Sequence, residues 1–426
     1  MGGWASSLHS VAAENPYRLS RQVVPTRYDL ALTPHLDEAT FDGRVSISVE
    51  ITEDTTDIVL NAAELEIHDV ELDLADGTRV PVTAELEPAT ERLRIVASRR
   101  LQPGSAQVRM GFRGVLNDRL RGFYRSTYVA EDGVQRIIAT TQMQATDARR
   151  AFPCFDEPDF KAVFGVTLIV DPEMLAVSNG PEISRAERGG KAIVRFADTM
   201  PMSTYLVAFV VGPLEATEPV DVNGCPLRVV HLPGKGHLTA FGLDCAAFGL
   251  RWFEEYYGIP YPGTKVDLIA LPDFAAGAME NLGCITFREN LLLVDPATST
   301  QGELEVVADV VLHELAHMWF GDLVTMGWWN GIWLNEAFAT FMEVDAGQHY
   351  RPEWERWATF SLERTVAFET DSLASTRPVE FEVNSPADSE GMFDVLTYQK
   401  GGALLRMLQQ YLGEDRFRDG VRHYLA

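Results

Sequence analysis

One short stretch decides which fold and chemistry this sequence specifies, His313-Glu314-Leu315-Ala316-His317. The residues around it, 309–320, are apolar at most positions with helical periodicity, which predicts a buried helix. Positions i and i+4 project from one face of a helix, so His313 and His317 can converge on one tetrahedral zinc ion with Glu314 beside them. Buried histidine and glutamate need partners or a metal, which favours zinc over a solvated helix face.

Glu336 is the predicted third ligand of this zinc ion. Eighteen residues separate it from His317, and it lies in a second predicted helix over 331–344. A carboxylate from an adjacent antiparallel helix completes a set of two histidines and one glutamate and leaves the fourth position for water. That is the arrangement of catalytic zinc sites. We therefore expect one Zn²⁺ per chain, held by His313, His317 and Glu336.

The composition excludes several classes of partner. The chain has 426 residues, with 36 Lys and Arg against 62 Asp and Glu, for a net charge of −26. Such a chain lacks the cationic surface that neutralises phosphates and is repelled by anionic membranes, so we expect no nucleic acid and no membrane partner. Residues 1–15 show no secretory signal, and the longest apolar run, 205–211, is too short to span a membrane. We expect a cytoplasmic protein, of unknown oligomeric state.

The pattern of apolar residues changes along the chain. Period-two alternation dominates the first half, clearest over residues 44–51, and a denser apolar strand is predicted over 202–213. We predict an N-terminal tail over 1–20 and an antiparallel β-sheet domain over 21–214. Short strands separated by Gly-containing turns are typical of such a domain.

Helical periodicity predominates in the second half of the chain. It predicts helices over 309–320, 331–344 and 402–412, and thus a mainly helical domain over 215–426. The pattern is still helical at Ala426, where no capping residue follows. We therefore expect the sequence to be a fragment that lacks a further C-terminal domain.

The sequence contains further spaced motifs besides the predicted zinc ligands. Thirty-one residues separate Gly277-Ala278-Met279-Glu280-Asn281 from His313. Further motifs lie at residues 122–126, 141–144, 147–158 and 398–401. From about residue 20 to its end, the sequence resembles the aminopeptidase N-like family of zinc metallopeptidases, in the gluzincin clan. The resemblance implies a saddle-like β domain followed by a thermolysin-like α/β catalytic domain.

The resemblance implies an aminopeptidase that hydrolyses the N-terminal peptide bond of peptides with a free N-terminus. Zinc lowers the pKa of its bound water, and Glu314 is expected to act as the general base. By resemblance to the family's Tyr-x-Lys-Gly element, Tyr398 stabilises the oxyanion. By the same resemblance, Glu280 pairs with the substrate's α-ammonium group.

Further substrate contacts are carried over by resemblance. The equivalents of Gly277 and Ala278 contact the substrate backbone, and that of Met279 lines the pocket for the first side chain. Gln144 occupies the second amine-contacting position, where many members have Glu; an amide still accepts a hydrogen bond, so we expect amine recognition to survive. Ala337 replaces a frequent Gly and favours the helix.

Two residues are candidates for orienting the ligands, and two other functions stay open. Asn335 and Glu343 flank and follow Glu336 and are interpreted as supports for it, against the alternative of a solvated helix face.

A relative with both epoxide-hydrolase and aminopeptidase activity would share the same metal set. A truncated zinc-binding module with little turnover is the other alternative. The preferred N-terminal residue and the limit on peptide length do not follow from the sequence.

Overall fold

The computed structural model describes residues 17–426, and its first half consists of three β-sheets. The largest has the strand order β13-β14-β11-β1-β2-β8-β4-β5 and is built from β1 (Val23–His35), β2 (Thr40–Ile51), β4 (Glu66–Leu74), β5 (Arg79–Val80), β8 (Gly104–Val115), β11 (Val163–Val170), β13 (Glu182–Arg188) and β14 (Lys191–Phe196). A three-stranded sheet contains β3 (Thr55–Asn61), β7 (Arg92–Leu101) and β6 (Val82–Glu87). A four-stranded sheet contains β12 (Leu175–Ser178), β15 (Phe209–Gly212), β10 (Gln135–Gln142) and β9 (Gly122–Val129).

Alternating burial explains why the first half forms sheets. In β2, Val45, Ile47 and Val49 are buried, whereas Arg44 and Glu50 are exposed. Successive side chains of a strand point to opposite faces, so this alternation gives the sheet one apolar face and one solvated face.

One pair of strands departs from the predicted antiparallel arrangement. Strands β1 and β11 pair in parallel, with Arg27 opposite Val163 and Leu32 opposite Leu168. Parallel neighbours need a long crossover, and here the intervening chain supplies it by forming the strands from β2 to β10. The other strand pairs of these three sheets are antiparallel, as predicted, and this pair is the exception.

The apolar segment 202–213 forms less strand than predicted. Within this segment only β15 is a strand, and the 3₁₀ turn η2 (Thr204–Leu206) precedes it. The side-chain amide of Asn179 donates to the Leu206 carbonyl at 2.8 Å and accepts from the Ala208 N–H at 2.9 Å. The backbone of this buried segment is therefore satisfied by a side chain instead of a strand ladder.

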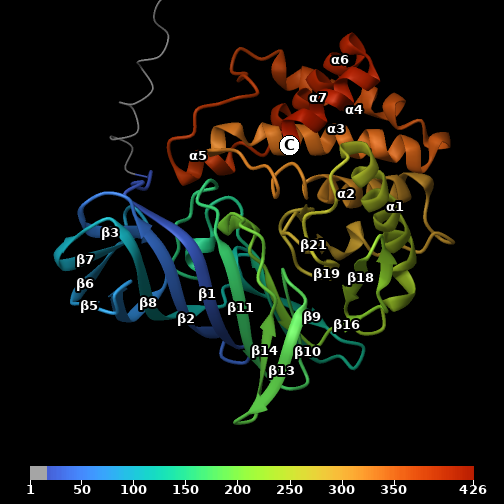
Figure 1. Ribbon diagram of the computed structural model, residues 1–426. Coiled ribbons are helices and arrows are strands. Elements are labelled where there is room, and N and C mark those ends of the chain that lie inside the picture. The colour runs from blue at the N-terminus through green and yellow to red at the C-terminus, as the bar shows by residue number, and fades with distance from the viewer. Residues whose placement is uncertain (1–16) are drawn as a thin grey trace, which may run out of the picture.

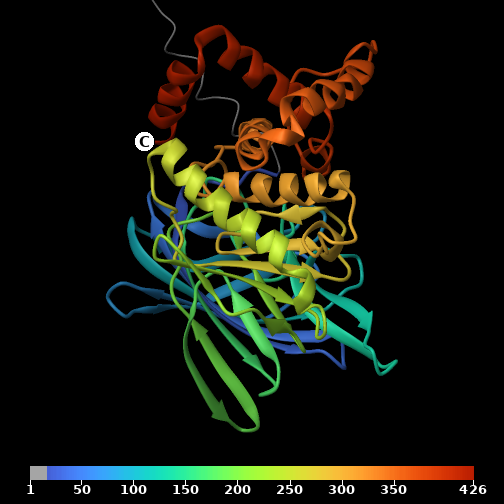
Figure 2. The same cartoon turned by 90° about the vertical axis from the view of Figure 1, so that its right-hand side faces the viewer.

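The second half combines one sheet with most of the helices. Its six-stranded sheet contains β16 (Glu215–Ala216), β17 (Val220–Val222), β18 (Cys225–His231), β19 (Val266–Leu271), β20 (Ala278–Met279) and β21 (Cys284–Arg288). The helices are α1 (Ala240–Tyr257), α2 (Gln301–Ala316), α3 (Trp333–Tyr350), α4 (Arg356–Asp371), α5 (Pro386–Glu390), α6 (Gly401–Leu412) and α7 (Glu414–Leu425). The prediction of a strand-rich part followed by a mainly helical part is confirmed, and Figures 1 and 2 show the helices gathered at one end of the molecule. None of the helices within residues 17–426 has both the length and the apolar character to cross a bilayer.

The bounds of α2 differ from the predicted helix over 309–320. The helix begins eight residues earlier, at Gln301, because Thr300 and Glu303 form a capping box in which each side chain accepts a hydrogen bond from the other's backbone N–H. It ends at Ala316, so His317 lies at its C-cap. The second ligand of the predicted pair is therefore placed at the junction between the helix and the following loop.

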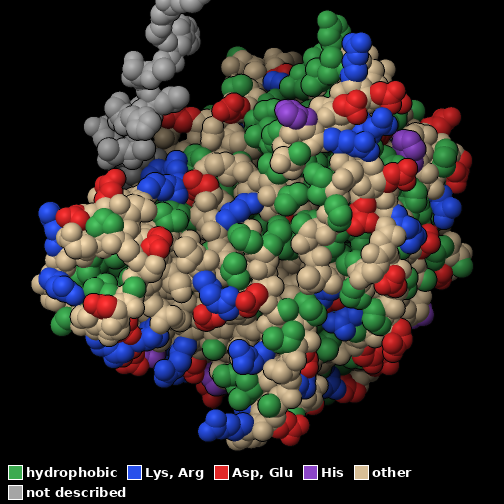
Figure 3. Space-filling view, in the orientation of Figure 1, with side chains coloured by type: hydrophobic (Ala, Val, Ile, Leu, Met, Phe, Trp, Pro, Cys, Tyr) green, Lys and Arg blue, Asp and Glu red, His purple; other side chains and the backbone are tan. Residues whose placement is uncertain are grey.

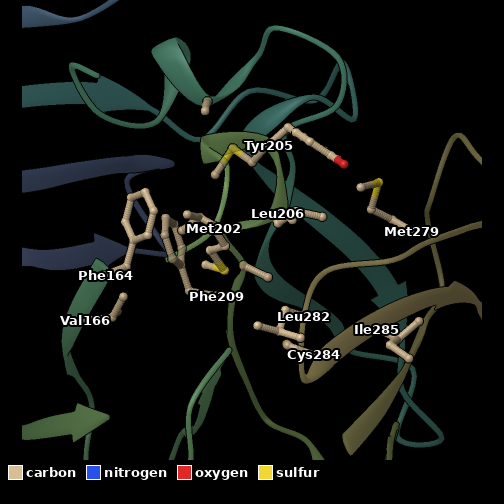
Figure 4. Packing of buried hydrophobic residues seen from close by; sticks show 14 of the residues in the cluster. Phe164, Val166, Met202, Tyr205, Leu206, Phe209, Met279, Leu282, Cys284 and Ile285 are labelled. Atoms are coloured by element: carbon tan, nitrogen blue, oxygen red, sulfur yellow. The ribbon is translucent and has the colours of Figure 1, made fainter. Parts of the chain in front are cut away.

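A single apolar core joins the two halves of the molecule. Figure 4 shows side chains from both halves in this cluster, Phe164, Val166, Met202, Tyr205, Leu206, Phe209, Met279, Leu282, Cys284 and Ile285. Sheet membership changes between β15, which ends at Gly212, and β16, which begins at Glu215. We propose the domain boundary between residues 214 and 215 on the basis of this change.

Residues before 21, the predicted start of the β domain, pack against it. Leu19 is buried, and its N–H donates to the Glu157 carboxylate at 2.5 Å. The Arg18 guanidinium contacts the same carboxylate at 3.1 Å. Residues 18 and 19 therefore belong to the packed structure, while residues 1–16 of the predicted tail lie outside the described residues.

A buried charge cluster holds the central strand of the six-stranded sheet. Asp267 is 1% exposed and accepts hydrogen bonds from Lys265 at 2.8 Å and Arg228 at 2.7 Å. Burial alone would raise the pKa of Asp267, but the two cations outweigh it and hold the pKa below its ordinary value. The ionised carboxylate therefore stabilises the folded state.

Asp267→Asn is expected to lower the free energy of unfolding by about 3 kcal/mol at pH 7, because Lys265 loses its charged partner in the core. The wild-type contribution is fully present above the unfolded-state pKa of about 4 and is lost as pH falls through the lower folded-state pKa, so the difference narrows in acid. Urea unfolding at pH 7 and below pH 4 measures both effects.

The matched control is Asp118→Asn, which removes an exposed carboxylate 3.3 Å from Arg125. It should change the free energy of unfolding by no more than about 0.5 kcal/mol. Equal losses in the two variants would contradict a stabilising role for the buried cluster.

Candidate metal centre and active site

The predicted metal ligands come together where α2 meets α3. His313 lies in the last turn of α2, His317 caps that helix, and Glu336 lies in the first turn of α3. The Nε2 atoms of the two histidines are 3.1 Å apart, and Glu336 Oε2 lies 3.3 Å from His313 Nε2 and 3.4 Å from His317 Nε2. Three donor atoms thus form a nearly equilateral triangle.

The triangle fits a tetrahedral divalent metal. His313 Nδ1 lies 2.5 Å from the Glu343 carboxylate and His317 Nδ1 lies 2.9 Å from the Phe320 carbonyl, so both Nδ1 atoms must donate. The Nε2 lone pairs then face one another, which is unfavourable unless a positive charge lies between them. Bonds of 2.0–2.1 Å to a tetrahedral zinc ion place its ligands about 3.3 Å apart. The observed spacing matches this value.

The charges around the triangle also favour a cation. Burial would raise the pKa of Glu336, but His317 and His313 outweigh it and hold the pKa at about 2. Burial would lower the pKa of His317, but Glu280 and Glu336 outweigh it and raise the pKa to about 9. The carboxylates therefore attract positive charge to the imidazoles, either as protons or as a metal ion.

Glu314 lies beside the triangle with an unused oxygen. It is 6% exposed, and its Oε2 has no hydrogen-bond partner among the described residues. Burial raises the pKa of Glu314 to about 8, with Glu280 and Glu336 adding to the rise and the two histidines opposing it. A carboxyl group with a pKa near neutrality can both accept and release a proton.

Glu280 and Gln144 meet next to Glu314. The Gln144 side-chain amide donates to the Glu280 carboxylate at 3.1 Å. One donor atom each from Glu280, Glu314 and His317 lies within 4.8 Å of the others. Burial raises the pKa of Glu280, and His317 opposes the rise. A second carboxylate is therefore held close to the candidate base, although the two belong to segments far apart in the sequence.

Tyr398 completes the group around the metal ligands. Its ring stacks on that of His313 with the centroids 5.9 Å apart. Burial raises the pKa of the Tyr398 hydroxyl well above 10, and the carboxylates of Glu336, Glu280 and Glu314 add to the rise. The hydroxyl therefore stays protonated and can donate a hydrogen bond.

A cavity of about 380 Å³ opens beside these groups, and Glu280, His317 and Glu336 lie outside its lining. Six of the predicted site residues line it, Gln144, Gly277, Ala278, His313, Glu314 and Tyr398. Met279 does not line this cavity; it is 1% exposed and packs in the core beside Tyr205 (Figure 4). Successive residues of the edge strand β20 point to opposite sides, so Ala278 faces the cavity and Met279 faces the core. That Met279 lines the pocket for the first side chain therefore stays a prediction.

The loop after α2 is held by side chains that no sequence motif indicates. Lys161 donates to the Asp322 and Leu323 carbonyls, each at 2.9 Å, and Tyr205 donates to the Gly321 carbonyl at 3.4 Å. Lys161 is 161 residues away from Asp322 in the sequence, so no local pattern indicates the contact. Both side chains come from the first half of the chain and fix the loop that follows His317.

The two predicted orienting residues differ in what they contact. Glu343 accepts the hydrogen bond from His313 Nδ1, as a ligand-orienting residue would. Asn335 instead donates to the Tyr205 hydroxyl at 3.2 Å. Asn335 therefore joins α3 to the first half of the chain, and no hydrogen bond from its side chain to Glu336 is present among residues 17–426.

Comparison with known proteins places this site in a family. Residues 24–206 match the Peptidase M1 N-terminal domain, and residues 241–426 match the Peptidase family M1 domain. The chain belongs to peptidase family M1. The predicted resemblance to this family of metallopeptidases is thereby confirmed, and the candidate metal centre lies within the segment that matches the M1 domain.

Curated relatives are aminopeptidases about twice as long as this chain. Aminopeptidase M1-A of Oryza sativa subsp. japonica is 43% identical over 96% of this chain and 47% of its own length. Alanine/arginine aminopeptidase of Saccharomyces cerevisiae is 40% identical over 96% and 48%. Puromycin-sensitive aminopeptidase of Caenorhabditis elegans is 40% identical over 99% and 45%. The chain spans about half the length of the curated relatives it matches.

Glu343→Gln is expected to weaken Zn²⁺ binding by about 10–100-fold, because an amide orients and polarises His313 less strongly than a carboxylate does. Competition with a chromogenic chelator measures the dissociation constant. Glu369→Gln, on the exposed surface of α4, is the control and should leave the constant unchanged. Unaltered zinc affinity in Glu343→Gln would show that the contact does not support the ligand.

Proposed function

We propose that this chain carries the active site of a zinc-dependent aminopeptidase that hydrolyses the N-terminal peptide bond of peptides. One observation carries the proposal: the donor atoms of His313, His317 and Glu336 form a triangle of tetrahedral spacing, with Glu314 and Glu280 close beside it. When bound, zinc lowers the pKa of water and polarises a substrate carbonyl. Residues of the chain itself carry out proton transfer, oxyanion stabilisation and recognition of the free N-terminus.

Glu314 supplies the proton transfers. Its unpaired oxygen, close to the metal ligand His317, suits a group that takes a proton from the attacking water and gives it to the leaving amine. Burial excludes bulk water from the carboxyl group, so the proton is passed to the amine and not lost to solvent.

Tyr398 stabilises the negative charge that develops on the carbonyl oxygen. Its hydroxyl stays protonated because burial and three carboxylates raise its pKa, so it can donate to that oxygen. A donor that is already oriented costs no rearrangement during the reaction, and one such donor typically contributes about 10²–10³ in rate. The stacking on His313 supports a position next to the metal ligands.

Glu280 and Gln144 select a free N-terminus. An α-ammonium group pairs with the Glu280 carboxylate, and Gln144 fixes that carboxylate through its amide. The Gln144 side chain adds no second negative charge, so ammonium recognition rests on Glu280. Because β20 is the last strand of its sheet, its free edge can align the substrate backbone beside the metal.

Glu314→Gln is expected to keep stoichiometric zinc and to lose about 10²–10⁴ in kcat, because the amide cannot accept the proton. Elemental analysis gives the zinc content, and release of the chromophore from an aminoacyl anilide gives kcat. His317→Ala is the contrasting variant and should lose zinc and turnover together.

Two results would contradict this assignment. Undiminished kcat in Glu314→Gln would exclude Glu314 as the base. Full zinc occupancy of the unaltered chain without any turnover would favour a zinc-binding module instead of an enzyme.

Glu280→Gln is expected to lower kcat/KM for aminoacyl substrates by at least about tenfold. Of Glu280 and Gln144, only Glu280 has a carboxylate that can pair with the substrate's α-ammonium group, and the substitution removes it. Initial rates over a range of substrate concentrations measure the effect. Glu255→Gln, on the outer surface of α1, serves as the control and should behave as the unaltered chain. An unchanged kcat/KM in Glu280→Gln would refute its role in amine recognition.

A further inference from the structure

The residue proposed to stabilise the oxyanion lies in an irregular turn. Tyr398 belongs to the π-helical turn η7 (Leu396–Lys400), which continues directly into α6. The Lys400 N–H donates to the Val395 carbonyl at 3.1 Å, five residues back, in place of the usual four. Turns of this kind occur often at functional sites, because the extra residue redirects the side chains around it.

Asp394 holds the start of this turn with its side chain. Its Oδ1 accepts hydrogen bonds from the Leu396 N–H at 3.0 Å and the Thr397 N–H at 3.1 Å. Its backbone carbonyl accepts from the Tyr398 N–H at 3.1 Å. The same residue therefore binds the backbone of Tyr398 and of both residues before it.

Arg377 holds Asp394 from a separate segment of the chain. Its guanidinium donates to Asp394 Oδ1 at 2.5 Å and to the Thr397 hydroxyl at 2.9 Å. The Thr397 hydroxyl in turn donates to the Met392 carbonyl at 2.5 Å. Arg377 thus bridges the capping carboxylate and the residue directly before Tyr398.

We propose that Arg377 and Asp394 are positioning residues that set the place of the Tyr398 hydroxyl in the transition state. The inference rests on the proposed function, because it presupposes that Tyr398 donates to the oxyanion. A displacement of about 1 Å in an active-site group can lower the rate by about 10²-fold. Loss of the hydrogen bonds that hold the backbone of this turn should therefore lower kcat more than it raises KM.

The exposure of the pair separates positioning from general support of the fold. The Asp394 side chain is 39% exposed and that of Arg377 is 14% exposed. Water screens the Asp394 end of this ion pair, so Asp394→Asn should cost little global stability, whereas Arg377 is more buried. Loss of the pair should therefore lower kcat while the unfolding midpoint, the zinc content and KM change little.

The test combines each substitution with Tyr398→Phe. Alone, Asp394→Asn and Arg377→Met should each lower kcat by about tenfold to a hundredfold with KM within about twofold. Arg377→Lys keeps the charge and should retain more activity than Arg377→Met. In the Tyr398→Phe background, Asp394→Asn should cause no further loss, because the group that it positions is gone.

Binding of a phosphinic pseudopeptide to the zinc-loaded chain gives a second measurement that does not depend on turnover. Its tetrahedral phosphorus oxygens occupy the place of the oxyanion, so Tyr398→Phe and Asp394→Asn should each raise its dissociation constant, and together no more than Tyr398→Phe alone. Asp57→Asn removes an exposed ion pair with Arg94 at 3.0 Å in the three-stranded sheet and is the control. It should change neither kcat nor inhibitor affinity.

The outcomes separate the two proposals. Wild-type kcat and affinity in Asp394→Asn, or losses that simply add to those of Tyr398→Phe, would overturn the positioning role and leave the role of Tyr398 intact. Wild-type behaviour of Tyr398→Phe would overturn both. A fall in zinc content or unfolding midpoint in Asp394→Asn that accounts for the whole loss would show that the pair only supports the fold.

Discussion

The triangle of three electron-rich donor atoms between α2 and α3 is the constraint on which the rest of the site depends. Two imidazole nitrogens 3.1 Å apart, with their other nitrogens already donating, leave no favourable arrangement without a positive charge between them. Carboxylates from several elements deepen the negative potential there. The geometry thus favours binding of a cation at the centre of the triangle. The groups proposed for proton transfer, oxyanion stabilisation and amine recognition are arranged around that position.

The first half of the chain takes part in building the site. Gln144 reaches the carboxylate of Glu280, while Lys161 and Tyr205 fix the loop that follows the second histidine. The apolar core is continuous across both halves.

Figure 3 also shows that exposed hydrophobic side chains gather over α6, at the end of the molecule away from the N-terminal sheets.

Much of this arrangement follows from short-range periodicity. Helical spacing predicts that His313 and His317 share a face, and period-two burial predicts the sheets, because both depend on neighbours within one element. The sequence does not show which side of the two-residue edge strand β20 faces the cavity, so it does not indicate that Ala278 lines the cavity while Met279 is buried. The contacts of Lys161 and Arg377 join separate segments, and no local pattern encodes them. The sequence therefore predicts the groups that do chemistry better than those that hold them in place.

The most direct test of the central claim is anomalous diffraction at the zinc edge from crystals of the chain loaded with Zn²⁺. We expect one strong peak per chain, bonded at about 2.0–2.2 Å to the Nε2 atoms of His313 and His317 and to a carboxylate oxygen of Glu336. Absence of a stoichiometric peak, or a peak held by other residues, would contradict the claim that this triangle is a metal site.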